Sequence, residues 1–216
     1  MEHSHAHRGF TLIELLIVSG IIVVITGIVF VNQSTFNKTL ILSNTAYDIA
    51  LSIQAAETYG MGGHSVGISP VGYGLHFDSN FPKEYKLFAD ISPQSSSGSA
   101  CHAPGNTQGG LDAQPGNCVY DAGNDSLVLT YGLGNGISIS EFCAYPAWGK
   151  YCASTGLTSL DVVFSRPNAA PLISTSGAYT ASAKSACLAA ISPQGGIRSV
   201  VISASGEIEV RQTACP

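Results

Sequence analysis

A single carboxylate, Glu14, lies inside an otherwise uncharged apolar run at residues 12–31, LIELLIVSGIIVVITGIVFV. A run of roughly 20 apolar residues is long enough for a helix to cross the hydrocarbon core of a bilayer. An ionised carboxylate is costly in that environment unless it stays near the interface or is paired. The sequence therefore predicts a membrane-spanning helix with a carboxylate near its start that needs a partner.

The cysteines are the second group of residues whose side chains could do chemistry. Their even number, in a chain expected to be exported, favours disulfides over free thiols, although many connectivities are open. We favour pairing between neighbours in the sequence: Cys101 with Cys118, Cys143 with Cys152, and Cys187 with Cys215.

Metal binding is the competing interpretation of several of these groups. The chain contains no C-x-x-C pair, and His102 beside Cys101 is the only nearby imidazole, so the spacing is poor for zinc. The acidic segment DAGND at residues 121–125 offers oxygens to calcium, but a short acidic turn is the simpler interpretation. We therefore predict no metal site and no cofactor.

The segment GHSVG at residues 63–67 matches the G-x-S-x-G pattern of hydrolases. A nucleophile elbow needs a strand before Ser65 and a helix after it, whereas here a helical pattern comes first and a strand pattern follows. His76 and His102 also follow too soon for a hydrolase sheet to form between them and the serine. GLGNG at residues 132–136 lacks a following helix and is predicted to be a hairpin turn. No catalytic residue is predicted.

The helical pattern continues beyond the apolar run. Glycines at positions 60, 62 and 63 end it, and no proline interrupts it, so we expect one helix over residues 10–59. Apolar residues at spacings of three and four predict that its second half packs on a core: Leu42, Ala46, Ile49, Ile53 and Ala56.

The remainder of the chain has strand patterns. The last two segments flank a turn at residues 204–206 and predict a hairpin. Strands that follow one long helix indicate an α+β fold, with an antiparallel sheet covered by the second half of the helix. The predicted strands are residues 71–78, 84–91, 126–132, 136–142, 159–165, 197–203 and 207–212.

These patterns divide the chain from residue 10 onward into three parts. They are the membrane-spanning half of the helix at 10–31, its amphipathic half at 32–60, and a β-rich head at 61–216. A Ser-, Gly- and Pro-rich stretch at residues 92–118 is predicted to be a long loop of the head.

Charge excludes one class of partner. The net charge is -5, only 11% of the residues are charged, and lysines and arginines do not cluster. Nucleic-acid binding through the phosphate backbone requires such a cluster. We therefore expect no nucleic-acid partner.

The segment RGFTLIELLIV at residues 8–18 resembles the leader junction of type IV prepilins and type II secretion pseudopilins. The resemblance implies that a prepilin peptidase removes residues 1–9 as a leader by cutting between Gly9 and Phe10, and that it N-methylates Phe10. It also implies that Glu14, fifth in the mature chain, sets the register of assembly by pairing with the Phe10 amine of a neighbour. The alternative is a pair between these two groups within one chain, since residues four apart on a helix are neighbours. The leader departs from the usual pattern because Arg8 is its only Lys or Arg, with histidines at positions 3, 5 and 7.

The head resembles the minor pseudopilin branch with FimT-type and H-type subunits, at AYDIALSIQAAETYG, GYGLHFD and the terminal RSVVISASGEIEV. This resemblance implies a non-enzymatic subunit of a type IV pilus or type II secretion pseudopilus. Its implied partners are prepilin peptidase, other pilin or pseudopilin subunits, the inner-membrane assembly platform and, before assembly, membrane lipid. It would be a single-pass inner-membrane protein with an extracytoplasmic head. The alternative is a signal-anchored extracytoplasmic domain that binds a ligand.

Overall fold

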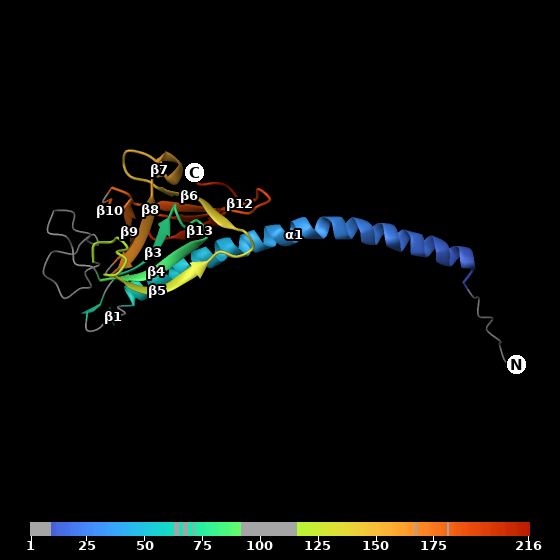
Figure 1. Cartoon of the computed structure of the whole chain (residues 1–216), viewed down its shortest axis with the longest axis horizontal. Helices are drawn as coiled ribbons and strands as arrows, with labels where there is room; N and C mark the ends of the chain where they lie inside the picture. The colour runs from blue at the N-terminus through green and yellow to red at the C-terminus, as the bar shows by residue number, and fades with distance from the viewer. Residues whose placement is uncertain are drawn as a thin grey trace. The chain divides into compact units, whose positions relative to one another are not determined.

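The computed structural model describes residues 10–62, 65–66, 69–70, 72–91, 116–166, 168–180 and 182–216. The elements are the helix α1 (Leu12–Met61), the short 3-10 helix η1 (Ala153–Thr155) and the strands β1 (Ser65–Val66), β2 (Ser69–Pro70), β3 (Gly72–Asp78), β4 (Glu84–Asp90), β5 (Ser126–Gly132), β6 (Ser138–Ala144), β7 (Tyr151–Cys152), β8 (Ser159–Ser165), β9 (Asn168–Thr175), β10 (Ala178–Tyr179), β11 (Ala186–Ile191), β12 (Ile197–Ile202) and β13 (Ile208–Arg211). The predicted α+β class with a long N-terminal helix is confirmed (Figure 1).

The chain forms two compact units, which divide between Leu40 and Ile41. In the first unit, residues 12–30 of α1 are mostly apolar and exposed. A stretch of 19 residues, Leu12–Phe30, is long and apolar enough to cross a membrane, and none of it is buried. A helix that leaves its apolar side chains uncovered on every face needs lipid or other apolar helices around it.

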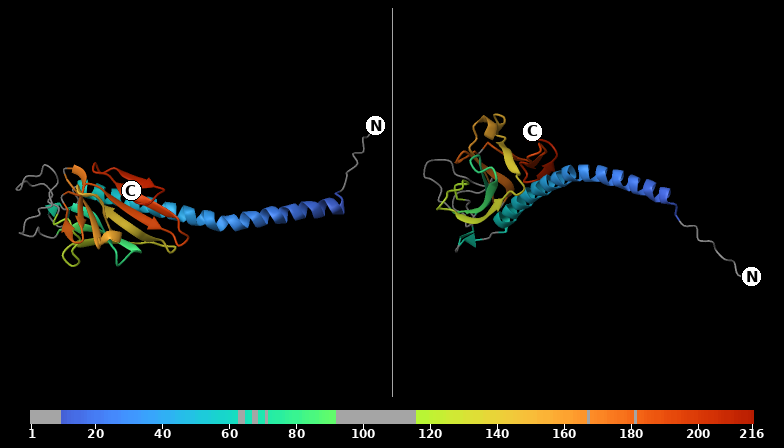
Figure 2. Two further views of the ribbon diagram at one scale, coloured as in Figure 1. Left: turned by 90° about the horizontal axis from the view of Figure 1, so that it is seen from above. Right: turned by 45° about the vertical axis from the view of Figure 1, so that its right-hand side comes forward.

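The second unit has one main core, to which the later part of α1 contributes one face. The five residues predicted to face a core are all buried there, as is Ala50. They pack against Leu75, Phe77, Tyr85 and Leu87 of β3 and β4 and against inner residues of the other strands. Both views in Figure 2 show this part of α1 running beside the strands. The amphipathic pattern thus correctly located the helix face that covers the head.

The strands form two main antiparallel sheets and a small two-stranded sheet, β1-β2. The six-stranded sheet has the order β10-β9-β8-β3-β4-β5, and the five-stranded sheet has the order β13-β12-β11-β6-β7. The terminal β12–β13 hairpin was predicted correctly, with Ile202 opposite Ile208. The core includes apolar residues of both sheets, so the head needs both to bury its interior.

One predicted hairpin is wrong. Residues 132–136 do not join two paired strands, because β5 pairs with β4 in the six-stranded sheet and β6 pairs with β11 and β7 in the other. Residues 132–136 instead connect one sheet to the other. Two of them, Asn135 and Gly136, have positive φ angles, of 57° and 73°. A turn-forming sequence between two strand patterns does not determine whether the strands pair with each other.

Two long strands were not predicted. β9 contains Pro171, which usually argues against a strand, but the β8–β9 register is irregular between Val163 and Ser165 and leaves Pro171 outside the paired positions. β11, ACLAAI, is rich in alanine and lacks alternation, because five of its six residues are buried. In both strands the tertiary setting overrides a weak local signal.

Candidate processing and assembly site

The start of α1 is fixed by a side-chain cap. The Glu14 backbone N–H donates to Oγ1 of Thr11 at 3.3 Å, and α1 begins at the next residue, Leu12. This is one half of a capping box, in which a threonine is followed three residues later by a glutamate. Phe10 lies before the cap, outside the helix, and is 81% exposed. Gly9 lies outside the described residues.

The Glu14 side chain lies in the first turn of α1. A carboxylate in that position is favoured by the helix dipole, since the first turn carries the positive end. Among the described residues, Glu14 takes part in no ion pair. The Thr11 cap was not predicted, although T-x-x-E spacing before an apolar run is a sequence signal for a capping box.

The apolar run contains two hydroxyl side chains that are satisfied within the helix. Oγ of Ser19 donates to the Leu16 carbonyl at 2.9 Å, and Oγ1 of Thr26 donates to the Ile22 carbonyl at 2.7 Å. Unsatisfied hydroxyls are costly in hydrocarbon, so these bonds suit the segment to lipid or to a bundle of apolar helices.

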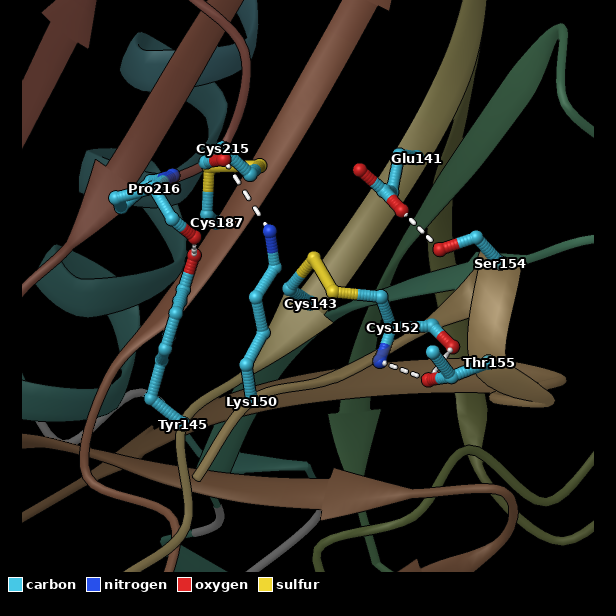
Figure 3. Close-up of a disulfide and its surroundings, with 10 residues drawn as sticks. All are labelled: Glu141, Cys143, Tyr145, Lys150, Cys152, Ser154, Thr155, Cys187, Cys215 and Pro216. Carbon is cyan, nitrogen blue, oxygen red and sulfur yellow. Dashed lines mark hydrogen bonds between the residues drawn. A yellow bond between two sulfur atoms is a disulfide. The ribbon is translucent and has the colours of Figure 1, made fainter.

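Two disulfides lie in the five-stranded sheet and its C-terminal extension: Cys143–Cys152 and Cys187–Cys215. The Tyr145 hydroxyl donates to the Pro216 carbonyl at 2.9 Å, so the last residue is also held (Figure 3). This sequential pairing is the one favoured for these four cysteines. Cys118 is disulfide-bonded too, whereas Cys101 lies outside the described residues.

One group in the described part of the chain has metal-ligand spacing: Glu141, Cys143 and Cys152. Its two cysteines are joined to each other, so neither sulfur is a thiolate, which is the form that binds metals. The Glu141 carboxylate accepts a hydrogen bond from the Ser154 hydroxyl (Figure 3). This group therefore stabilises the β6–β7 corner in its oxidised form.

A buried carboxylate, Asp90, binds the backbone of residues 117 and 118. Its two oxygens accept the backbone N–H groups of Asn117, at 3.2 Å, and Cys118, at 2.7 Å. Burial, together with the nearby Asp125 charge, raises the pKa of Asp90 to about 8, although those two N–H groups act in the opposite direction. This role of Asp90 was not predicted, because in the sequence Asp90 only follows an ordinary strand pattern.

A second buried carboxylate lies on β8. Oδ1 of Asp161 contacts Nδ1 of His76 at 2.7 Å and accepts the Tyr120 backbone N–H at 3.3 Å. Burial raises the pKa of Asp161, and the hydrogen bond with His76 opposes this. Asp90 and Asp161 thus hold the same segment, residues 117–120, against the six-stranded sheet.

The acidic turn at residues 121–125 uses its oxygens for the backbone. Asp125 accepts the Asp121 N–H at 2.7 Å and the Ile91 N–H at 3.0 Å, and Asp121 accepts the Asn117 side-chain amide at 2.5 Å. These contacts support the interpretation of the segment as a structural turn.

Ser65 follows a helix rather than a strand, because it is the first residue of β1 and three residues separate it from the end of α1 at Met61. A nucleophile elbow requires the opposite order. Gly63, His64 and Gly67 of the pattern, and His102, lie outside the described residues. His76 is engaged with Asp161, as described above.

A groove of about 510 Å³ lies between α1 and the end of β5. Tyr85 and Tyr131 stack there with ring centroids 4.9 Å apart, and the Tyr85 hydroxyl bonds Ser52 at 2.9 Å. Burial raises the pKa of Tyr85 to about 12, so the phenol is neutral at physiological pH. The lining includes hydroxyls and one carboxylate, Asp48, but no cysteine, histidine or lysine.

The prokaryotic N-terminal methylation motif matches residues 4–30, which include the cap, Glu14 and the exposed apolar part of α1. This is the prepilin-type motif of type IV pilins and pseudopilins. No curated protein and no solved structure matches the chain. The chain thus has a pilin-like N-terminus, and its one apolar helix is consistent with a membrane-anchored protein.

Proposed function

We propose that this protein is a non-enzymatic subunit, a pilin or minor pseudopilin, of a type IV pilus or type II secretion pseudopilus. The observation that supports this most directly is the coincidence of the prepilin-type motif with the exposed start of α1. The motif matches residues 4–30; within the described part of that range the helix begins at Leu12, and Phe10 is exposed before it. A pilin requires this arrangement, since processing and assembly both use the same N-terminus.

Processing is proposed between Gly9 and Phe10. Proteases act on extended backbone, and Phe10 and Thr11 are outside the helix. Because Thr11 caps the start of α1, Phe10, the residue after the proposed cleavage point, lies outside the helix. The new amine of Phe10 would then be N-methylated by the same peptidase.

Assembly is proposed through the apolar half of α1. When such helices leave lipid and pack together, an unpaired carboxylate among them costs several kcal/mol. Pairing of Glu14 with the Phe10 amine of a neighbouring subunit removes that cost and sets the stagger. The Thr11 cap supports this role because it already satisfies the Glu14 N–H and leaves the carboxylate available.

The proposal places the subunit first in the inner membrane, with its head outside the cytoplasm, and then in a fibre. Prepilin peptidase, other pilin or pseudopilin subunits and an inner-membrane assembly platform are its proposed partners, with lipid around α1 before assembly. The disulfides support an exported head, since such bonds persist in oxidising compartments.

Coexpression of the full-length chain with a prepilin peptidase tests the proposal. We expect mass spectrometry of the membrane-extracted protein to show loss of nine residues and a methylated Phe10. Gly9→Val should block cleavage, because a branched side chain replaces the small residue at the cut. The matched control is Gly20→Val, in the exposed part of α1, where an added Cβ meets no atom within 4 Å; it should leave cleavage intact.

An intact leader in the wild-type protein would contradict the proposal. The chain would then be better described as an extracytoplasmic domain on a signal anchor, and the groove beside Tyr85 and Tyr131 would be the place to look for a bound ligand.

A further inference from the structure

Three cysteines form a row across adjacent strands of the five-stranded sheet. Cys143 on β6 is the register partner of Cys152 on β7 and also of Cys187 on β11. Residues directly opposite on antiparallel strands have Cα atoms roughly 4.5–5.5 Å apart and point to the same face. Cys143 therefore has a cysteine beside it on both sides.

The two disulfides use only one of these neighbours. Cys143 is bonded to Cys152, with a Cα–Cα distance of 4.0 Å, and Cys187 is bonded to Cys215, with a distance of 5.7 Å. Cys143, Cys187 and Cys215 nevertheless belong to one buried cluster with Cys152 (Figure 3). The Cα separation of opposite residues falls in the range that a disulfide spans, so the folded sheet also accommodates a Cys143–Cys187 bond.

We propose that Cys143 and Cys187 form an intramolecular thiol–disulfide exchange site. The Cys143 thiol is free before the Cys143–Cys152 bond forms, or after an external dithiol has reduced that bond and been oxidised to its own disulfide. The Cys143 thiol then loses its proton, and the thiolate attacks Sγ of Cys187. The Cys143–Cys187 bond forms, the Cys187–Cys215 bond breaks, and Cys215 leaves as a thiolate that takes up a proton. The number of disulfides stays the same, so this step needs no oxidant or reductant.

The charges around the cluster favour this direction. The Glu141 carboxylate lies within 4.8 Å of the sulfurs of Cys143 and Cys152, where it disfavours a thiolate. The Lys150 ammonium donates to the Cys215 carbonyl at 3.3 Å, where it favours a thiolate on the same residue (Figure 3). Cys215, which lies beside a cation, is therefore better placed than Cys143, which lies beside a carboxylate, to carry the thiolate.

The exchange has a consequence for the end of the chain. Cys215 lies beyond β13, and its disulfide with Cys187 of β11 joins the segment after β13 covalently to the sheet. After exchange, those residues are held only by contacts such as the Tyr145–Pro216 and Lys150–Cys215 hydrogen bonds. Once the Cys143 thiol is free, the exchange step therefore releases the C-terminal segment from its covalent attachment to the sheet. The inference does not depend on the function proposed above.

Two single variants of the full-length chain test the inference. In Cys152→Ser, the freed thiol is Cys143, directly opposite Cys187; in Cys143→Ser, the freed thiol is Cys152, which lies one strand further from Cys187. Each purified protein in detergent is incubated at about pH 8, near the ordinary thiol pKa. It is then quenched in acid, unfolded, alkylated and mapped by peptide mass spectrometry.

We expect the label in Cys152→Ser to move from Cys143 to Cys215, with a Cys143–Cys187 peptide appearing. In Cys143→Ser the label should stay on Cys152. A label that remains on Cys143 in folded Cys152→Ser overturns the proposal. Equal scrambling in both variants overturns it as well, because unfolding would then explain the exchange.

A double variant covers the case in which a single variant does not fold. Cys152→Ser/Cys215→Ser keeps only the proposed exchange partners in this cluster. We expect a Cys143–Cys187 disulfide to form in it during oxidative expression, with a wild-type circular dichroism spectrum. Two free thiols in the folded double variant would show that the sheet does not permit the bond.

Discussion

The backbone nitrogen of Glu14 lies 3.3 Å from Oγ1 of Thr11, so the residue that caps the helix binds the backbone of Glu14 and not its carboxylate. This relationship separates two roles that mutation of Glu14 alone would confuse. Thr11 satisfies a backbone donor at the helix start, whereas the Glu14 side chain remains available for a partner outside its own first turn.

The first prediction concerns Glu14→Leu. Leucine suits a bilayer better than glutamate, so insertion should be intact, and cleavage should survive because Gly9 and Phe10 are unchanged. Entry into the fibre should fail, since the Phe10 amine of a neighbour would be buried without its partner. Processed monomer should therefore accumulate in the membrane fraction, as immunoblots of membrane and sheared-fibre fractions would show.

Thr11→Ala is the matched control for that prediction. Loss of the cap costs roughly 1 kcal/mol of helix stability, but the carboxylate is retained, so fibres should still form. If Glu14→Leu assembles at the wild-type level, Glu14 does not set the register between subunits, and a pair within one chain becomes the better account. If both variants fail equally, the helix start rather than the charge is what assembly requires.

The second prediction is that Gly60→Ala destabilises the head. A Cβ on Gly60 would lie 2.2 Å from the Phe164 carbonyl oxygen, a backbone atom that moves only with β8. Overpacking of this kind costs about 1–3 kcal/mol, more than the roughly 1 kcal/mol that alanine gains over glycine in a helix. The thermal midpoint should fall. Gly132→Ala, where an added Cβ meets nothing within 4 Å, should leave it unchanged or slightly raised.

The third prediction is a decline in stability as the pH rises. Burial raises the pKa of Asp90 to about 8, whereas an unfolded aspartate titrates near pH 3.9. Between these values the native state holds the proton that the unfolded chain has lost, so the free energy of unfolding falls with increasing pH. One such group contributes at most about 1.4 kcal/mol per pH unit. The raised pKa of Asp161 acts in the same direction.

Urea denaturation at pH 5 and pH 8 measures this effect. Asp90→Asn cannot titrate, so its unfolding midpoint should fall less between the two pH values than that of the wild type. Exposed Glu207→Gln is the control and should retain the wild-type decline. A wild-type midpoint that is higher at pH 8 than at pH 5 would show that other carboxylates dominate the titration.

The fourth prediction concerns the head alone. A chain that starts at Asn32 lacks the exposed apolar stretch Leu12–Phe30 but keeps the whole second unit with its core. We expect it to be soluble after oxidative expression and to contain no thiol that reacts with a thiol reagent in denaturant. Six reactive thiols in the folded head would contradict a disulfide-bonded, exported protein.

Elements whose signals are local could be predicted from the sequence. The spacing of Leu42, Ala46 and Ile49 placed the buried face of α1, and RGFTLIE placed the proposed processing point, because helix periodicity and peptidase recognition both depend on neighbours in the chain. The terminal hairpin was predicted for the same reason: its turn and its alternation lie within a few residues of each other.

The contacts between distant segments, by contrast, depend on long-range packing. Residues 132–136 were expected to close a hairpin, yet β5 and β6 belong to different sheets, because pairing depends on which strands share a core and not on the turn between them. Asp90 became an anchor only when Asn117 and Cys118 were folded against it. Cys143 and Cys187 are 44 positions apart in the printed sequence, and their juxtaposition follows from the β6–β11 register, which is set by long-range burial that no local pattern encodes.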